Sequence, residues 1–262
     1  GQTPDLLAAV LERGYLKVAV RVWPDRTFSP PVFGNAFGAL DGYEVDLAWA
    51  LADGLDVGLE MSESDPRRIV AGGWQGEWDV ALAWLAMTDN AQQTLIFSSP
   101  YAYDRGGLAV HASNQAIAGF DDLGGRRVGL PANTLYQQLL DGQAIAMQGE
   151  FISLSLPPGV QGIPFNHDGN ALRQLARADD ASPEAVVHSM QALNAALAAG
   201  LPLKVVAETP FLVPVGVAFD RGGAPSGALL NETNRILAEM RQNGALAELS
   251  VKWYQADLTR TP

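Results

Sequence analysis

Apolar residues in the first hundred positions gather into short runs that alternate with segments of helical periodicity. The run at 16–22 is short and rich in β-branched residues, which is typical of a strand buried on both faces. Leu6, Leu7 and Val10 instead recur at helical spacing. The same criteria predict further strands at 57–61 and 78–85 and further helices at 45–55 and 67–71. This alternation predicts a mainly parallel sheet with right-handed crossovers.

A second series of strands and helices follows after about residue 104. It comprises predicted strands at 108–111, 127–130, 151–154 and 185–188, with helices starting near 135, near 171 and before 199. Two more strands, 203–207 and 213–219, lead into a long amphipathic helix that Gly244 ends. The chain carries no flexible linker, so strand-like crossings near Tyr103 and Pro210 are expected to join the two series.

Composition limits the classes of function. The 262 residues are 48% hydrophobic and 18% charged, which is typical of a globular protein. The longest apolar stretch, 80–87, is far shorter than the roughly 20 residues that cross a bilayer, so no membrane insertion is expected. A net charge of -12 argues against nucleic acid as a partner. The absence of cysteine and of an initial methionine is compatible with an exported, processed protein.

No catalytic motif is present. The three histidines are scattered, and the chain has no nucleophile elbow, no phosphate-binding loop and no paired metal ligands. The aspartate pairs at 121–122 and 179–180 stand beside turn residues, where helix caps or solvated loops explain them. We therefore expect no catalytic residue, no cofactor and no metal.

Six short motifs occur in order along nearly the whole chain. They are GYLKVAV at 14–20, GYEVDL at 42–47, WDVA at 78–81, FSSPY at 97–101, DLGGRRVG at 122–129 and GALAELSVKWY at 244–254. In this order and spacing they resemble the family 3 solute-binding proteins of ABC transporters, which have the type II periplasmic binding protein fold and include receptors for polar amino acids.

The resemblance implies an α/β fold of two lobes with a ligand cleft between them. Lobe 1 is expected to be discontinuous, with residues 1–103 and 211–262, and lobe 2 to cover 104–210. Open α/β sheets independently favour ligands beyond the carboxyl ends of their strands. The resemblance also implies a monomeric receptor in the periplasm or at the cell surface, which passes a small-molecule solute to an ABC transporter permease.

Two positions depart from the amino-acid receptors that the chain resembles. Those receptors carry an arginine for the ligand carboxylate after the third strand, where this chain has Ala91. They carry an aspartate for the ligand ammonium after the strand at 185–188, where this chain has Ser189, next to His188. Each lost charge-assisted hydrogen bond is worth about 1.5–3 kcal/mol. We therefore expect a solute other than an ordinary α-amino acid.

Aromatic residues occupy several of the remaining cleft positions that the resemblance implies. Trp23, Phe28, Trp84 and Tyr136 are predicted to line an apolar-walled pocket, although each ring is about as compatible with core packing. Asn133 and Thr134 precede a predicted helix start that can donate backbone N–H groups. The predicted ligand-binding set is completed by Asp25, Ala86, Ala91, His188 and Ser189.

Two other functions remain open from the sequence. Some proteins of this fold are dehydratases that need a general acid in the cleft, for which His188 and Asp25 are the candidates. Others are sensor or adaptor domains that bind a partner protein, and loss of the amino-acid clamps is compatible with that role.

Overall fold

The computed structural model describes residues 4–166 and 170–261. Contacts divide the chain into unit 1, with residues 1–22, 31–103 and 214–262, and unit 2, with residues 23–30 and 104–213. The predicted lobe ranges differ from this division in two places. The second boundary lies three residues later than predicted, and residues 23–30 group with unit 2 because the short helix η1 (Arg26–Phe28) packs against helix α6 (Met190–Ala198).

Unit 1 is built on a five-stranded sheet in the order β4-β1-β5-β14-β6. Its strands are β1 (Tyr15–Val20), β4 (Gly58–Glu63), β5 (Val80–Leu82), β6 (Leu95–Asp104) and β14 (Val213–Asp220). Its helices are α1 (Leu6–Arg13), α2 (Tyr43–Gly54), α3 (Pro66–Ala71), η2 (Ala91–Gln93), α7 (Gly227–Gln242) and α8 (Ala245–Tyr254). Strand β1 runs parallel to β4 and β5, whereas β14 is antiparallel to β5.

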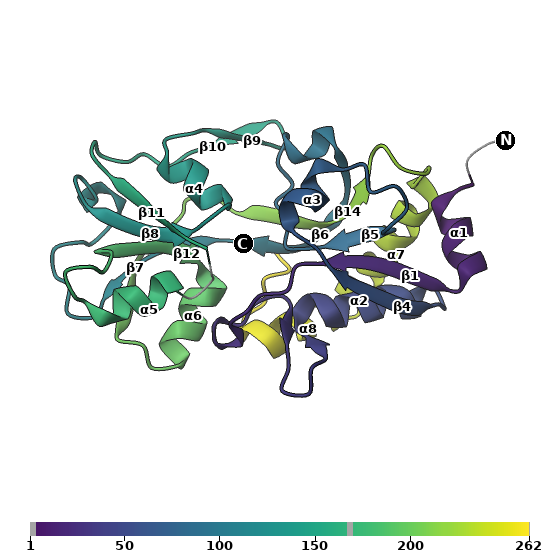
Figure 1. The fold of residues 1–262 in the computed structure, drawn as a ribbon, viewed down its shortest axis with the longest axis horizontal. Helices are drawn as coiled ribbons and strands as arrows, with labels where there is room; N and C mark the ends of the chain where they lie inside the picture. The colour runs from purple at the N-terminus through teal and green to yellow at the C-terminus, as the bar shows by residue number, and fades with distance from the viewer. Residues whose placement is uncertain (1–3, 167–169, 262) are drawn as a thin grey trace. The chain divides into compact units, whose positions relative to one another are not determined.

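Alternation along β1 explains why both faces of this sheet are covered. Val18 and Val20 point to a core formed with α1, α2, α7 and α8, whereas Ala19 points to a second core that contains Trp74 and Trp78 beside α3. Figure 1 shows α2 and α8 on one side of the strands and α3 on the other. The valines of β1 thus face the layer of four helices, whereas the smaller Ala19 faces the side that Trp74 and Trp78 cover.

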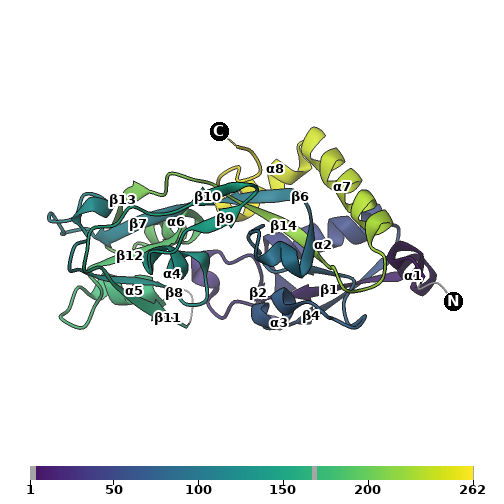
Figure 2. The ribbon, with the colours of Figure 1, turned by 90° about the horizontal axis from the view of Figure 1, so that it is seen from above.

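The two ends of the chain meet in unit 1. Asp5 caps α1 by accepting a hydrogen bond from the backbone of Leu7 at 2.9 Å, and Gly14, with φ 81°, ends the helix. The backbone N–H of Leu6 donates to the carbonyl of Pro225 at 2.9 Å, and α7 lies beside α1 (Figure 2). Residues from both ends of the sequence are therefore needed to complete this unit.

Unit 2 has its own five-stranded sheet, in the order β11-β8-β12-β7-β13. The strands are β7 (Gly106–His111), β8 (Arg127–Pro131), β11 (Gln161–Phe165), β12 (Ala185–Ser189) and β13 (Leu203–Glu208). The helices are η1, η3 (Phe120–Asp122), α4 (Leu135–Leu140), α5 (Asn170–Arg177) and α6. Leu108 and Val110 of β7 pack toward the core that contains α4, whereas Ala109 packs toward the core of α5 and α6.

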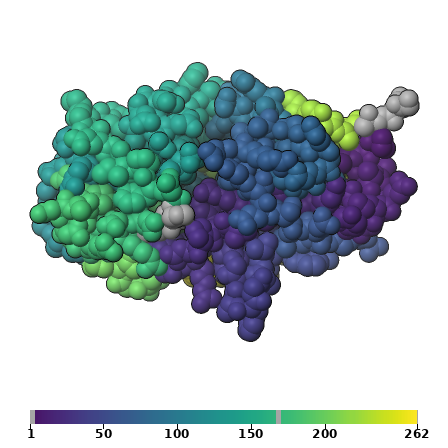
Figure 3. Space-filling view, in the orientation of Figure 1, coloured from purple at the N-terminus to yellow at the C-terminus, as the bar shows by residue number. Residues whose placement is uncertain are grey.

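Several elements differ from those that the sequence predicts, among them the ten-residue strand β6, which was expected only as a crossing near Tyr103. Strand β11 was not predicted, because Pro164 interrupts its pattern; proline is tolerated there because β11 lies at the sheet edge. The strand predicted at 151–154 is β10 (Glu150–Ile152), which pairs only with β9 (Ile145–Met147) in a separate hairpin. A further hairpin, β2 (Phe33–Gly34) with β3 (Leu40–Asp41), projects from unit 1 (Figure 3) and exposes 95% of Phe37.

Candidate solute-binding residues

The segment after β5 carries three of the predicted site residues, Trp84, Ala86 and Ala91. Ala86 forms a single bridge with Val215, and the N–H of Met87 donates to the carbonyl of Pro214 at 3.0 Å. Ala91 begins η2 and is 6% exposed. These contacts place the segment at the carboxyl end of β5, which is the edge of an α/β sheet where ligands usually bind.

Trp84 is the residue with the most unusual backbone in this segment. Its φ of 50° lies in the left-handed region, which bulky side chains rarely adopt. Its backbone N–H donates to Oε1 of Glu44 at 2.6 Å, and the hydroxyl of Tyr101 donates to the same oxygen. The half-buried indole makes edge contacts with Tyr43, Tyr101 and Tyr254 at centroid distances of 6.2, 6.1 and 5.9 Å.

Glu44 is absent from the predicted site set. It is fully buried in the first turn of α2, and this burial raises its pKa to about 7 although hydrogen bonds from Tyr101 and Trp84 and the charge of Arg21 act in the opposite direction. One signal in the sequence points to it. Glu44 shares a helical face with Leu47, Ala48 and Leu51, so a carboxylate interrupts an otherwise apolar stripe.

In unit 2, the segment with Trp23, Asp25 and Phe28 is held by Arg173 of α5. The guanidinium of Arg173 donates to Asp25 at 2.8 Å and lies 5.0 Å from the centre of the Phe28 ring. Burial acts to raise the pKa of Asp25, but hydrogen bonds from Arg173 and Thr27 outweigh it and lower that pKa below its usual value. Asp25 is therefore ionised at neutral pH and is poorly suited to act as a general acid.

Trp23 and Phe28 have exposed fractions of 8% and 2%, and Tyr136 has 3%. Phe28 packs in the core of α5 and α6, whereas Tyr136 packs in the core of α4 on the opposite face of the sheet. Trp84 belongs to unit 1. The structure thus places Phe28, Tyr136 and Trp84 against three separate cores. The contact of the four predicted aromatic residues with a ligand stays a prediction.

The predicted helix start at Asn133 and Thr134 is occupied by internal hydrogen bonds. The N–H of Asn133 donates to Oε1 of Gln137 at 3.0 Å, and the hydroxyl of Thr134 donates to the carbonyl of Pro131 at 2.7 Å. Helix α4 has only six residues, so its dipole is small. The hydroxyl of Tyr136 donates to Asp104 at 3.2 Å.

His188 and Ser189 end β12 immediately before α6. Nδ1 of His188 accepts a hydrogen bond from the backbone N–H of Ser189 at 2.8 Å. Burial lowers the pKa of His188 to about 4, so the imidazole is neutral at physiological pH. At neutral pH His188 is not an imidazolium ion and Asp25 is a carboxylate, so neither candidate is in the form of an effective general acid, which argues against a dehydratase. Ser189 is 7% exposed and offers only a neutral hydroxyl where the resemblance implies a carboxylate.

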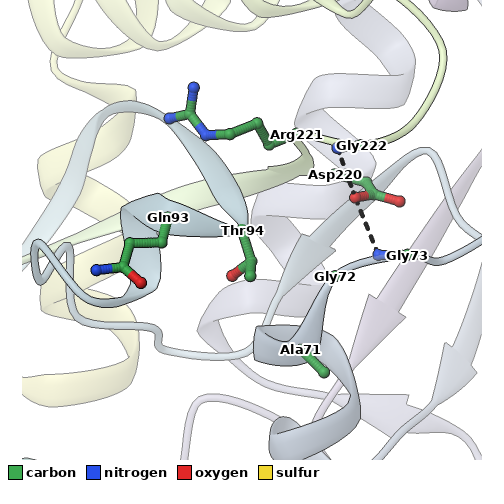
Figure 4. Close-up of a pocket in the computed structure, with 8 residues that line it drawn as sticks. All are labelled: Ala71, Gly72, Gly73, Gln93, Thr94, Asp220, Arg221 and Gly222. Atoms are coloured by element: carbon green, nitrogen blue, oxygen red, sulfur yellow. Dashed lines mark hydrogen bonds between the residues drawn. The ribbon is translucent and has the colours of Figure 1, made fainter.

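A shallow cavity of about 330 Å³ lies at the other edge of the unit 1 sheet (Figure 4). It is lined by Ala71, Gly72, Gly73, Gln93, Thr94, Asp220, Arg221 and Gly222. Asp220 accepts hydrogen bonds from the backbones of Gly73 and Trp74, and Arg221 donates to the carbonyls of Gln92 and Leu95. Its residues precede β5, precede β6, or end and follow the antiparallel β14, so the cavity lies at the end of the sheet away from Trp84. No predicted site residue lines it.

Comparison with known proteins identifies the family. Residues 20–256 match the family described as bacterial extracellular solute-binding proteins, family 3. The chain belongs to this family. It is 28% identical over 261 residues to the L-cystine-binding protein TcyJ of Escherichia coli (strain K12), which covers 97% of this chain and 88% of that protein. It is 23% identical over 261 residues to the L-cystine-binding protein TcyA of Bacillus subtilis (strain 168), with coverages of 98% and 87%.

Among solved structures, an ancestral arginine-binding protein bound to glutamine is similar to the chain, with 27% identity and a TM-score of 0.72. The match covers 92% of this chain and 98% of that chain. The predicted two-lobed α/β type II periplasmic binding protein fold is confirmed. Family 3 comprises solute-binding proteins of ABC transporters, so the chain is a solute-binding protein and not an enzyme. In the described part of the chain, no helix is long and apolar enough to cross a membrane.

Proposed function

We propose that this family 3 protein is the monomeric receptor of an ABC importer, exported to the periplasm or the outer cell surface, where it delivers a small solute to the permease. Its support is the family match across 20–256 and the near-complete overlap with the L-cystine-binding protein TcyJ. The longest apolar stretch, 80–87, is compatible with such a protein.

The solute that we propose is not a free standard α-amino acid. The observation that carries this proposal is the chemistry of the segment after β5. Residues 83–93 contain no lysine or arginine, and Ala91 stands buried in η2. The nearby Arg221 is already committed, because its guanidinium donates to the carbonyls of Gln92 and Leu95 at 2.9 and 3.1 Å.

Unit 2 supports the same conclusion. The hydroxyl of Ser189 is neutral, and Arg105 of the same unit forms an ion pair with Glu208 at 2.8 Å. A free amino acid would therefore leave both its carboxylate and its ammonium without a charged partner at these two positions. The free-energy cost of removing two unpaired charges from water exceeds the stabilisation that neutral hydrogen bonds provide. A solute without that zwitterionic group avoids this cost.

The test is isothermal titration calorimetry with the 20 standard amino acids and L-cystine, combined with native mass spectrometry of the gently purified chain. We expect every one of these amino acids to bind more weakly than about 100 µM, which corresponds to about -5.5 kcal/mol. We also expect a co-purified solute of another chemical class. A micromolar titration with any free α-amino acid would overturn the proposed ligand class, and a chain that carries and binds no solute would overturn the receptor function.

A further inference from the structure

The left-handed conformation of Trp84 needs a physical explanation. At φ 50° the Cβ of a tryptophan is crowded against the neighbouring backbone, so the conformation is strained and persists only where surrounding contacts impose it. Such strained residues concentrate at ligand-binding positions. Trp84 follows β5 directly, at the sheet edge where α/β proteins bind ligands.

Glu44 supplies the contact that imposes this conformation. Its Oε1 accepts the backbone N–H of Trp84 at 2.6 Å and also the hydroxyl of Tyr101. Tyr101 is itself fixed, since its carbonyl accepts the hydroxyl of Tyr43 at 2.8 Å. Glu44 is 0% exposed, so its carboxylate cannot rotate away into water. Because the position is buried, water does not compete for this hydrogen bond.

The side chain of Trp84 is oriented as well as its backbone. Nε1 of the indole is buried and, within the described residues, has no hydrogen-bond partner. Because Nε1 is the single polar atom of the side chain, the exposed part of the indole consists of carbon atoms. The half-buried ring therefore presents an apolar surface, held by its edge contacts with Tyr43, Tyr101 and Tyr254.

We propose that Glu44 is a positioning residue that holds Trp84 in its left-handed conformation, so that the carbon surface of the indole selects an apolar or flat group of the solute. The selection step rests on the proposed receptor function, whereas the positioning step does not. A charged or strongly hydrated group at this position would lose hydration against carbon, while a flat apolar group would gain contact area. This adds a source of specificity to the missing charged contacts.

The first experiment measures positioning without a ligand. The chain is labelled with 5-fluorotryptophan, and the ¹⁹F signal of Trp84 is assigned by its loss in Trp84→Phe. Glu44→Gln retains an acceptor oxygen, so we expect it to keep the Trp84 signal close to its original shift. Glu44→Ala removes the acceptor and is expected to move or broaden that signal. Glu63→Gln, at an exposed position on β4, is the matched control and should change nothing.

The second experiment measures the co-purified solute by native mass spectrometry. Glu44→Ala is expected to reduce solute occupancy at least fivefold relative to the original chain and to Glu44→Gln. Glycine adopts positive φ freely, so in a Trp84→Gly background the additional Glu44→Ala change should have no further effect on occupancy. Thermal unfolding of each variant verifies that it is folded.

The outcomes separate the two steps. An unchanged Trp84 signal in folded Glu44→Ala overturns the positioning role. A changed signal with unchanged solute occupancy overturns the role in selection. If the original chain carries no solute, the receptor proposal and the selection step that rests on it both fail, and the ¹⁹F signal still decides whether Glu44 positions Trp84.

Discussion

Replacing Glu44 with glutamine should remove a pH dependence of the folding free energy that can be worked out from the structure. Burial raises the pKa of Glu44 from 4.5 to about 7. Because the pKa in the folded chain lies above that of an unfolded glutamate, the protonated form favours folding. The corresponding stability is fully present below pH 4.5 and is lost as the pH rises through 7.

The magnitude follows from the two pKa values. At about 1.36 kcal/mol for each pKa unit, the difference between 4.5 and about 7 amounts to about 3 kcal/mol. Glutamine does not titrate, and its amide oxygen can still accept from the backbone of Trp84 and the hydroxyl of Tyr101. Between pH 5 and pH 8, Glu44→Gln should therefore gain up to about 3 kcal/mol of stability relative to the original chain.

Urea unfolding, followed by tryptophan fluorescence at several pH values from 5 to 8, measures this difference. Comparing the two chains at each pH removes the contribution of every other titrating group, because both chains contain the same ones. Glu63→Gln again serves as control, since it removes a carboxylate from the exposed surface. If the stability curves of Glu44→Gln and the original chain run parallel across this range, the assignment of a raised pKa to Glu44 is wrong.

Two further predictions concern unit 2. Gly106→Ala would place a Cβ 2.6 Å from Cε1 of the buried Tyr136, so it should destabilise the fold by about 1–3 kcal/mol, measured as a lower thermal midpoint. At Gly119 an added Cβ would meet nothing within 4 Å, so Gly119→Ala is the control and should leave the midpoint unchanged. Burial lowers the pKa of His188 to about 4, so the original chain should lose about 3 kcal/mol of stability as the pH falls from 6.5 to 4. His188→Asn should abolish this loss, because asparagine does not titrate and still offers an acceptor to the Ser189 backbone N–H. Urea titrations at pH 4, 5, 6 and 7 would contradict the second prediction if both chains weakened equally.

The fold was predictable because its strongest signals are local. The β-branched run of β1, the short run of β5 and the long amphipathic α7 all carry their structure in their own periodicity. Strand β11 was missed for a local reason too, since Pro164 is excluded from a central strand but accepted at an edge. Whether a strand becomes an edge is decided by residues that lie elsewhere in the chain.

The site was less predictable because its contacts are long-range. Glu44 meets Trp84 across 40 positions and Tyr101 across 57, and neither spacing has a periodic signature. Phe28 and Tyr136 are both aromatic residues of short helices, η1 and α4, but they pack against opposite faces of one sheet. The sequence identifies which residues are apolar, whereas the tertiary contacts determine which face each one covers.

The position of β14 in the unit 1 sheet has a consequence for the order in which the chain acquires its structure. Strand β14 lies between β5 and β6, and residues 213–220 that form it are made after the whole of unit 2. Before they appear, β5 and β6 each present an unpaired strand edge, which invites association with another chain. During synthesis from the amino terminus, the sheet of unit 2 can form first, whereas the sheet of unit 1 cannot be completed until β14 and α7 have been synthesised. Nascent chains shorter than about 220 residues should therefore be the species most in need of protection against aggregation.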